Sequence, residues 1–246
     1  MNHSAHVDAL FAALLAAGES VPRVAEVFAQ EPDEEVVVSV LRRAVPVRAL
    51  EHLVRTRPWS ESSRVLAAVV LNPKSPPRLS LTVVPGLTWR SLADVAISPR
   101  VPSAVKLRAE SVLKERLPEM RLGEKITLGR LATPSVLLVL LVETDPRVIE
   151  ACLDNPRLRE ADLAGLLRRP DAAPVLIEAA AASSRWVRSY VVKLEIAVQP
   201  RTPLAVALAQ LSSLNRADLI RVSRTPGLRP LVQAAALRVA GGEETQ

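Results

Sequence analysis

Apolar residues recur along this chain at helical spacing, in short stretches that prolines separate. Val105, Ala109, Val112 and Leu113 are one example of a spacing near i, i+3, i+4 and i+7. We count about seventeen such candidate helices, most of them about ten residues long. Helices of this length are marginal alone in water, so they must stack on their neighbours. No hairpin turn between alternating strands is visible, and the pattern predicts an all-α fold.

Proline pairs mark where one helix ends and the next begins. In the segment Leu71 to Pro76, Pro73 disfavours helix at Asn72 and is predicted to end the preceding helix there. Ser75 is then the expected N-cap, with Pro76 at the first helical position. The segment Val198-Gln199-Pro200-Arg201-Thr202-Pro203 has the same form in the second half.

The chain repeats itself at an offset of about 125 residues. The stretch from Pro22 to Pro32 matches Pro146 to Pro156 at five of eleven positions. The stretch from Trp59 to Val105 aligns without gaps on Trp186 to Val232, with 11 identities in 47 pairs. Such self-similarity is typical of repeat architectures and indicates a tandem duplication over nearly the whole chain.

The domain organisation follows from this repeat. We predict a single α-solenoid over residues 1–240, in which each helical unit contacts mainly the next. Its halves are expected at about 7–113 and 131–240, joined by 114–130. Residues 241–246 are predicted to form a flexible polar tail.

A recurring cadence in the second half carries a resemblance. The segments Asp145 to Val148, Leu153 to Leu158 and Glu160 to Leu163 read DPRV, LDNPRL and EADL. This cadence resembles the leucine-rich repeat variant, a HEAT-like bacterial family of helical repeats. Leu71 to Leu79 and Val198 to Leu208 are similar to it, so the resemblance covers about half the chain. It implies a fold, and it transfers no catalytic residue.

Residues that commonly carry catalysis are sparse. The chain has three histidines and one cysteine, with no His-Glu-x-x-His pair, no Cys-x-x-Cys and no Gly-rich phosphate loop. Cys152 lies in an apolar helical pattern and is predicted to be a buried, inert thiol, which departs from the cysteine-rich iron–sulfur segment of one member of the resembled family. The densest acidic group, Glu31, Asp33, Glu34 and Glu35, is predicted to open a helix, where its charge offsets the dipole. We expect no enzyme activity, no cofactor and no metal site.

The net charge and the hydropathy of the chain bear on where the protein is expected to be located. The 32 basic residues exceed the 26 acidic ones, which gives a net charge of +6. The longest uninterrupted apolar run, Val136 to Val142, is far shorter than the roughly 20 residues of a membrane span. Residues 1–17 lack the basic segment that precedes the apolar stretch of a secretory signal. We therefore expect a cytoplasmic protein without a membrane partner.

A double arginine recurs in both halves and is the first candidate for a contact surface. Arg42 and Arg43 match Arg168 and Arg169 at an offset of 126, and no acidic neighbour at helical spacing explains both side chains. The alternative is a solvated helix end, where cations suit the helix dipole.

The tryptophans separate into two kinds. Trp59 and Trp186 hold equivalent positions and are expected to be core anchors of the repeat. Trp89 aligns with Arg216, so it has no aromatic counterpart and joins the candidate contact residues. A partly buried packing role is the alternative for Trp89.

These observations favour a scaffold or adaptor that binds another protein along its helical surface, because solenoids form extended concave faces. Nucleic-acid binding through an arginine-lined face stays open as the alternative. Against it, acidic residues are interspersed with the basic ones, and the aromatic content of 2% leaves few stacking platforms for bases.

Overall fold

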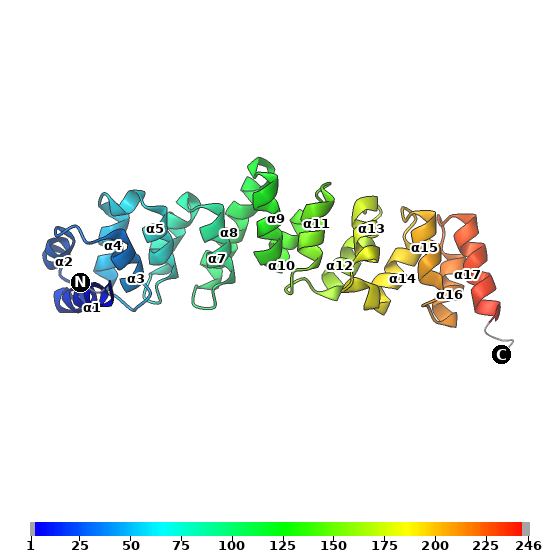
Figure 1. Cartoon of the computed structure of the whole chain (residues 1–246), viewed down its shortest axis with the longest axis horizontal. Coiled ribbons are helices and arrows are strands. Elements are labelled where there is room, and N and C mark those ends of the chain that lie inside the picture. The colour runs from blue at the N-terminus through cyan, green and yellow to red at the C-terminus, as the bar shows by residue number, and fades with distance from the viewer. Residues whose placement is uncertain (1–2, 243–246) are drawn as a thin grey trace. The chain divides into compact units, whose positions relative to one another are not determined.

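The computed structural model describes residues 3–242, and all regular secondary structure in that range is helical (Figure 1). Seventeen α-helices and four short 3₁₀-helices lie in the described residues. The all-α fold and the helix number predicted from the sequence are therefore confirmed. The chain divides into two compact units, Met1–Glu119 and Met120–Gln246. The division lies within the 114–130 segment, which is itself largely helical.

Unit 1 is built from eight α-helices among its described residues. They are α1 (His3–Ala17), α2 (Val21–Phe28), α3 (Glu34–Val40), α4 (Val47–Arg55), α5 (Ser63–Leu71), α6 (Pro77–Val83), α7 (Trp89–Ile97) and α8 (Ser103–Arg116), with the 3₁₀-helices η1 (Trp59–Glu61), η2 (Val84–Gly86) and η3 (Leu117–Glu119). The helices α1, α3, α5 and α7 contact one another in succession. On their other side, α2 contacts α4 and α6 contacts α8. We call such a succession of contacting helices a row, and chain neighbours also pack, as in α1–α2, α4–α5, α5–α6 and α7–α8, which is typical of helical repeats.

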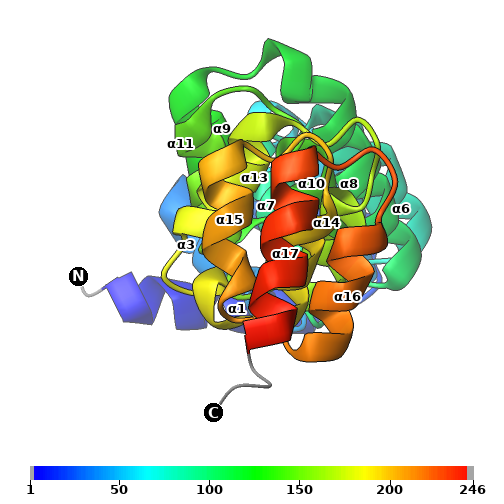
Figure 2. The same cartoon turned by 90° about the vertical axis from the view of Figure 1, so that its right-hand side faces the viewer.

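Unit 2 follows the same scheme with nine α-helices in its described part. They are α9 (Leu122–Leu131), α10 (Pro134–Leu140), α11 (Pro146–Leu153), α12 (Glu160–Leu167), α13 (Pro174–Ala182), α14 (Tyr190–Val198), α15 (Leu204–Leu211), α16 (Arg216–Arg224) and α17 (Pro230–Gly242), with the 3₁₀-helix η4 (Trp186–Arg188). One row consists of α10, α12, α14 and α16, a second of α9, α11 and α13, and α15 contacts α17. Figure 2 shows α17 between α15 and α16, both of which it contacts.

Polar caps explain where several of these short helices begin. The Asp33 carboxylate accepts a hydrogen bond from the Glu35 amide at 2.8 Å, which confirms that the acidic group opens a helix. The hydroxyl of Ser62 accepts from the Val65 amide at the start of α5. The predicted end of this helix at Asn72 is confirmed, since α5 ends at Leu71.

Two local predictions from the sequence are wrong. Ser75 is not an N-cap, because its hydroxyl pairs with that of Ser80, and α6 begins at Pro77 with Pro76 as its N-cap. Proline geometry alone is enough to start that helix one residue later. Gly241 and Gly242 belong to α17 and not to a tail. The remaining residues of the predicted tail, 243–246, lie outside the described residues.

Buried side-chain amides connect three pairs of successive helices within these rows. Asn72 is 4% exposed, and its Nδ2 donates to the carbonyl oxygens of Leu41 and Arg43, at 2.7 and 2.8 Å. Its Oδ1 accepts from the Lys74 amide. The side chain thus ties the end of α5 to the end of α3 and turns the chain toward α6.

The same amide device recurs twice in unit 2. Gln199 donates to the carbonyls of Leu167 and Arg169 and accepts from the Arg201 amide. Asn155 donates to the carbonyls of Gly129 and Ala132 and accepts from the Arg157 amide. All three amides directly precede a proline, which explains why the Asn-Pro and Gln-Pro segments stood out in the sequence.

Candidate functional site

The double arginines lie in equivalent turns, directly after α3 and after α12. In each turn, a buried side-chain amide donates hydrogen bonds to the carbonyl oxygens of the residues on both sides of the first arginine. Arg43 donates its backbone N–H to the Val40 carbonyl, and Arg169 donates to Leu166 in the same way. The carbonyls that flank Arg42 and Arg168 are therefore held by equivalent contacts.

Three of the four arginines have a carboxylate partner that helical spacing could not reveal. Arg43 lies 2.8 Å from Asp8 of α1, and its guanidinium lies over the Phe11 ring at 5.2 Å. Arg169 makes a two-pronged contact with Asp171, which lies two residues further along the chain. These pairs are exposed, where ion pairs stabilise by at most about 1 kcal/mol.

Arg168 has the most enclosed partner of the set. Its Nη2 lies 2.7 Å from Oε1 of Glu195, a residue of α14 whose side chain is 4% exposed. The hydrogen bond to Glu195 and the charge of that carboxylate raise the pKa of the Arg168 guanidinium above its ordinary value. Arg168 thus neutralises a carboxylate inside unit 2.

Arg42 differs from the other three. It is exposed, and among residues 3–242 no carboxylate lies within ion-pairing distance of it. Its side chain lines a groove of about 540 Å³ formed by α3, α5, α7 and the turns that follow α3 and α7. Figure 1 shows these helices in unit 1. Arg42 is therefore the predicted site residue that the structure leaves available.

The groove combines apolar and cationic side chains. Val38, Ala67, Ala68 and Leu71 are its main apolar residues, and Ser91, Ser98 and Pro99 also contribute. Arg64 and Arg100 join Arg42 in the lining, whereas no acidic residue does. Arg64 lies 3.4 Å from Glu34 and 3.6 Å from Glu35, outside the groove lining. The surface suits a ligand that has both an apolar part and a negative charge.

The structure places Trp89 apart from this groove. It is partly buried as the first residue of α7 and is not among the residues that line the groove. Trp59 and Trp186 are buried at the starts of η1 and η4, which confirms their expected role as equivalent core residues. Trp186 also donates its indole N–H to the Leu153 carbonyl at 2.9 Å.

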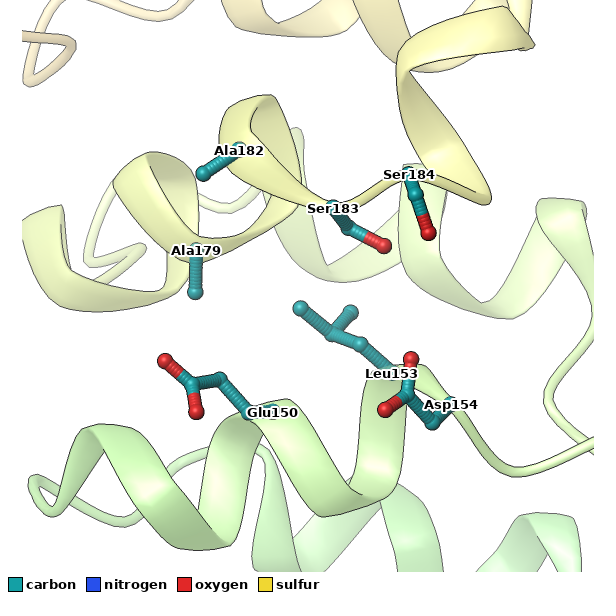
Figure 3. A pocket seen from close by; sticks show the side chains of 7 residues that line it. All are labelled: Glu150, Leu153, Asp154, Ala179, Ala182, Ser183 and Ser184. Atoms are coloured by element: carbon teal, nitrogen blue, oxygen red, sulfur yellow. The ribbon is translucent and has the colours of Figure 1, made fainter.

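A smaller cleft of about 200 Å³ lies in unit 2 between α11 and α13 (Figure 3). Glu150 and Asp154 lie on one side of it and Ala179 and Ala182 on the other. The Ser183 hydroxyl at its edge is buried without a hydrogen-bond partner among the described residues. The cleft lining therefore offers two like charges, two hydroxyls and apolar groups, without a cation.

Cys152 and His52, which belong to residue types often used in catalysis, pack against other side chains within their units. Cys152 is buried as predicted, and burial, followed by the Glu143 charge, raises the pKa of its thiol to about 12. His52 stacks on Phe28 at 5.2 Å between ring centroids, and burial lowers the pKa of its imidazole. Within residues 3–242, no group of three or more His, Cys, Asp and Glu side chains is arranged to hold a metal ion.

Comparison with known proteins yields no relative: no family model, no curated protein and no solved structure matches this chain. Among the described helices, none has the length and apolar character needed to cross a membrane.

Sequence reasoning identified Arg42 but missed the other residues of the groove. Arg64 and Arg100 were not singled out, because each stands alone in a helix or a turn. The signal that could have found the groove was present in the repeat alignment, where Ala68 aligns with Glu195. A small residue that aligns with a charged one marks a place where the two halves differ in chemistry.

Proposed function

We propose that this chain is a non-enzymatic scaffold or adaptor of the cytoplasm that binds a protein partner through the groove between α3, α5 and α7. The observation that carries the proposal is the environment of Arg42, an arginine without a partner in the described chain beside apolar side chains. Protein interfaces favour such a combination, with arginine enriched beside a desolvated apolar patch.

The proposed architecture is an α-solenoid of the HEAT-like, leucine-rich-repeat-variant kind that arose by duplication. Three observations support it: the successive contacts of helices within each row, the recurring buried amides, and the equivalent places of Trp59 and Trp186. In such folds, neighbouring repeats form continuous surfaces for partners.

Nucleic-acid binding is the weaker alternative. A phosphate backbone is tracked by a series of available cations. Here Arg43, Arg168 and Arg169 are already paired with carboxylates of the chain. The three arginines that line the groove lie in one pocket, and Arg64 among them is also paired, with Glu34 and Glu35.

Site-specific photocrosslinking in the native cytoplasm tests the proposal. A photoreactive amino acid replaces Arg100, which lines the groove, and in a matched control it replaces Leu107, an exposed residue of α8. A discrete protein adduct that survives nuclease and forms only from position 100 is the expected result. Protein adducts that form equally from positions 100 and 107 would overturn the proposal. Crosslinking of position 100 to nucleic acid alone would overturn it as well.

A further inference from the structure

The two units carry different residues at one equivalent place, Ala68 in α5 and Glu195 in α14. Both helices have a serine N-cap, Ser62 or Ser189, whose hydroxyl accepts from the backbone N–H three residues later. Both helices are followed by the buried amide that ties them to the preceding helix of the row. Each is nine residues long, and Ala68 and Glu195 are the sixth residue.

The arginine that faces this place is also equivalent in the two units. The amides of Asn72 and Gln199 hold the carbonyls on either side of Arg42 and of Arg168, respectively. In unit 2 the arginine reaches the carboxylate of the helix at 2.7 Å. In unit 1 the arginine and Ala68 line the same open groove, and the carboxylate is missing.

Other substitutions between the units shift the charge in the same direction. The repeat alignment places Arg64 opposite Val191 and Arg100 opposite Gly227, so the groove lining of unit 1 gains two guanidinium groups, of which that of Arg64 is paired with Glu34 and Glu35. It also places Ser91 opposite Asp218, which removes a second carboxylate. The groove of unit 1 thus has three arginines in its lining and no acidic residue, whereas the equivalent surface of unit 2 has an internally neutralised arginine.

We propose that the groove binds a glutamate or aspartate side chain of the partner protein, with the carboxylate beside Arg42 in the place that Glu195 occupies in unit 2. This inference rests on the proposed function, because it specifies the ligand of the same groove. Arg42 provides a charge-assisted hydrogen bond, which is stronger than a neutral one. Val38, Ala68 and Leu71 accept apolar neighbours of the acidic residue. The partner segment is therefore acidic and apolar together.

The Ala68→Glu variant supplies the missing carboxylate from within the chain. It recreates the Arg168–Glu195 arrangement in unit 1 and occupies the proposed binding place without removing a core side chain. Stability measurements on Ala68→Glu, Arg42→Gln and the double variant form a thermodynamic cycle. A favourable coupling between Glu at position 68 and Arg42 is expected, and zero coupling would show that the two positions do not meet.

Selection from a displayed library of random twelve-residue peptides on the full chain tests the ligand. Recovered peptides are expected to contain Glu or Asp beside apolar residues. Replacing the acidic residue of the peptide by its amide should lower the affinity about tenfold or more, because a charge-assisted hydrogen bond is lost. The Ala68→Glu and Arg42→Gln variants of the protein should bind the original peptides with a similar loss of affinity. Ala68→Gln is the uncharged control of equal size and should weaken binding less than Ala68→Glu.

The outcomes separate this inference from the proposed function. One contrary result is the recovery of peptides that are apolar, lack acidic residues and yet fail to bind the Ala68→Glu variant. That result would keep the groove as a protein-binding site and would overturn the claim that it binds a carboxylate. If no recovered peptide loses affinity for the Ala68→Glu and Arg42→Gln variants, both the proposed function of the groove and its carboxylate ligand would be overturned. A random duplex oligonucleotide that binds the wild type in a salt-dependent manner and is lost with Arg42→Gln would assign the groove to phosphate instead.

Discussion

Arg168 and Glu195 form an ion pair at 2.7 Å in which the carboxylate is buried and the guanidinium is half exposed. The pair connects the turn after α12 to the middle of α14, at the place where unit 1 has the groove beside Arg42. Equivalent places in the two units thus differ, with an ion pair in unit 2 and an open groove in unit 1. In unit 2 the arginine has a carboxylate partner within the unit, whereas Arg42 of unit 1 has none among the described residues.

The stability of the fold should depend on Arg168 but not on Arg42. Arg168→Gln leaves the buried Glu195 carboxylate without its charged partner, so we expect a loss of about 1–3 kcal/mol of unfolding free energy. Arg42→Gln is the matched control and should change stability by less than about 0.5 kcal/mol, as other exposed substitutions do. Urea unfolding followed by circular dichroism measures both. Equal losses in the two variants would contradict the assignment of Arg42 as a free side chain.

The buried amides should be essential and partly interchangeable. Asn72→Ala leaves the carbonyls of Leu41 and Arg43 without their donor and is expected to cost about 2–3 kcal/mol. Asn72→Gln should cost less, because Gln199 makes the same pair of hydrogen bonds in unit 2. Thermal unfolding of the two variants gives the comparison. A glutamine variant as unstable as the alanine variant would show that the two amides are not equivalent.

The thiol of Cys152 should be inert in the folded protein. Its pKa is raised to about 12 from an ordinary value of 9.0, so the folded state favours the protonated thiol. The stabilisation is fully present below about pH 9 and is lost as the pH rises toward 12, because only the unfolded thiol ionises in that window. A disulfide reagent at pH 8 should label Cys152 only after unfolding. Rapid labelling of the native chain at pH 8 would contradict the burial.

Alanine should stabilise the protein less at Gly129 than at Gly165, although both glycines lie in helices. An added Cβ at Gly165 meets no atom within 4 Å, so Gly165→Ala should stabilise α12 by about 0.5–1 kcal/mol. At Gly129 the Cβ would lie 3.0 Å from the Cys152 sulfur, where α9 and α11 contact. Gly129→Ala is therefore expected to gain less stability or to lose some. The combination with Cys152→Ala should recover the difference, and no recovery would place the strain elsewhere.

The helical fold could be predicted from the sequence because local signals agree along the chain. Apolar spacing located the helices, and prolines located their ends, as at Asn72. The predicted helix start was wrong by one residue where a serine hydroxyl has two possible hydrogen-bond partners. Ser75 carries an N-cap side chain, yet its hydroxyl bonds to Ser80 because Pro77 begins the next helix.

The candidate site was less predictable, since ion pairs across helices leave no local pattern. Arg43 meets Asp8, which lies 35 residues away in sequence, and Arg168 meets Glu195 on the next helix of its row. Helical spacing alone leaves these arginines without partners. Only the packing of rows shows that Arg42 is the one of the four without a carboxylate in the described chain.

The most direct test of the account is the yield of the protein adduct formed in cells from a photoreactive residue at position 100, compared between the wild-type background and Ala68→Glu. We predict that Ala68→Glu lowers the yield about tenfold or more while the helical signal and the unfolding midpoint are retained, because the added carboxylate occupies Arg42. An unchanged yield in a folded Ala68→Glu variant would contradict the claim that a partner binds in this groove.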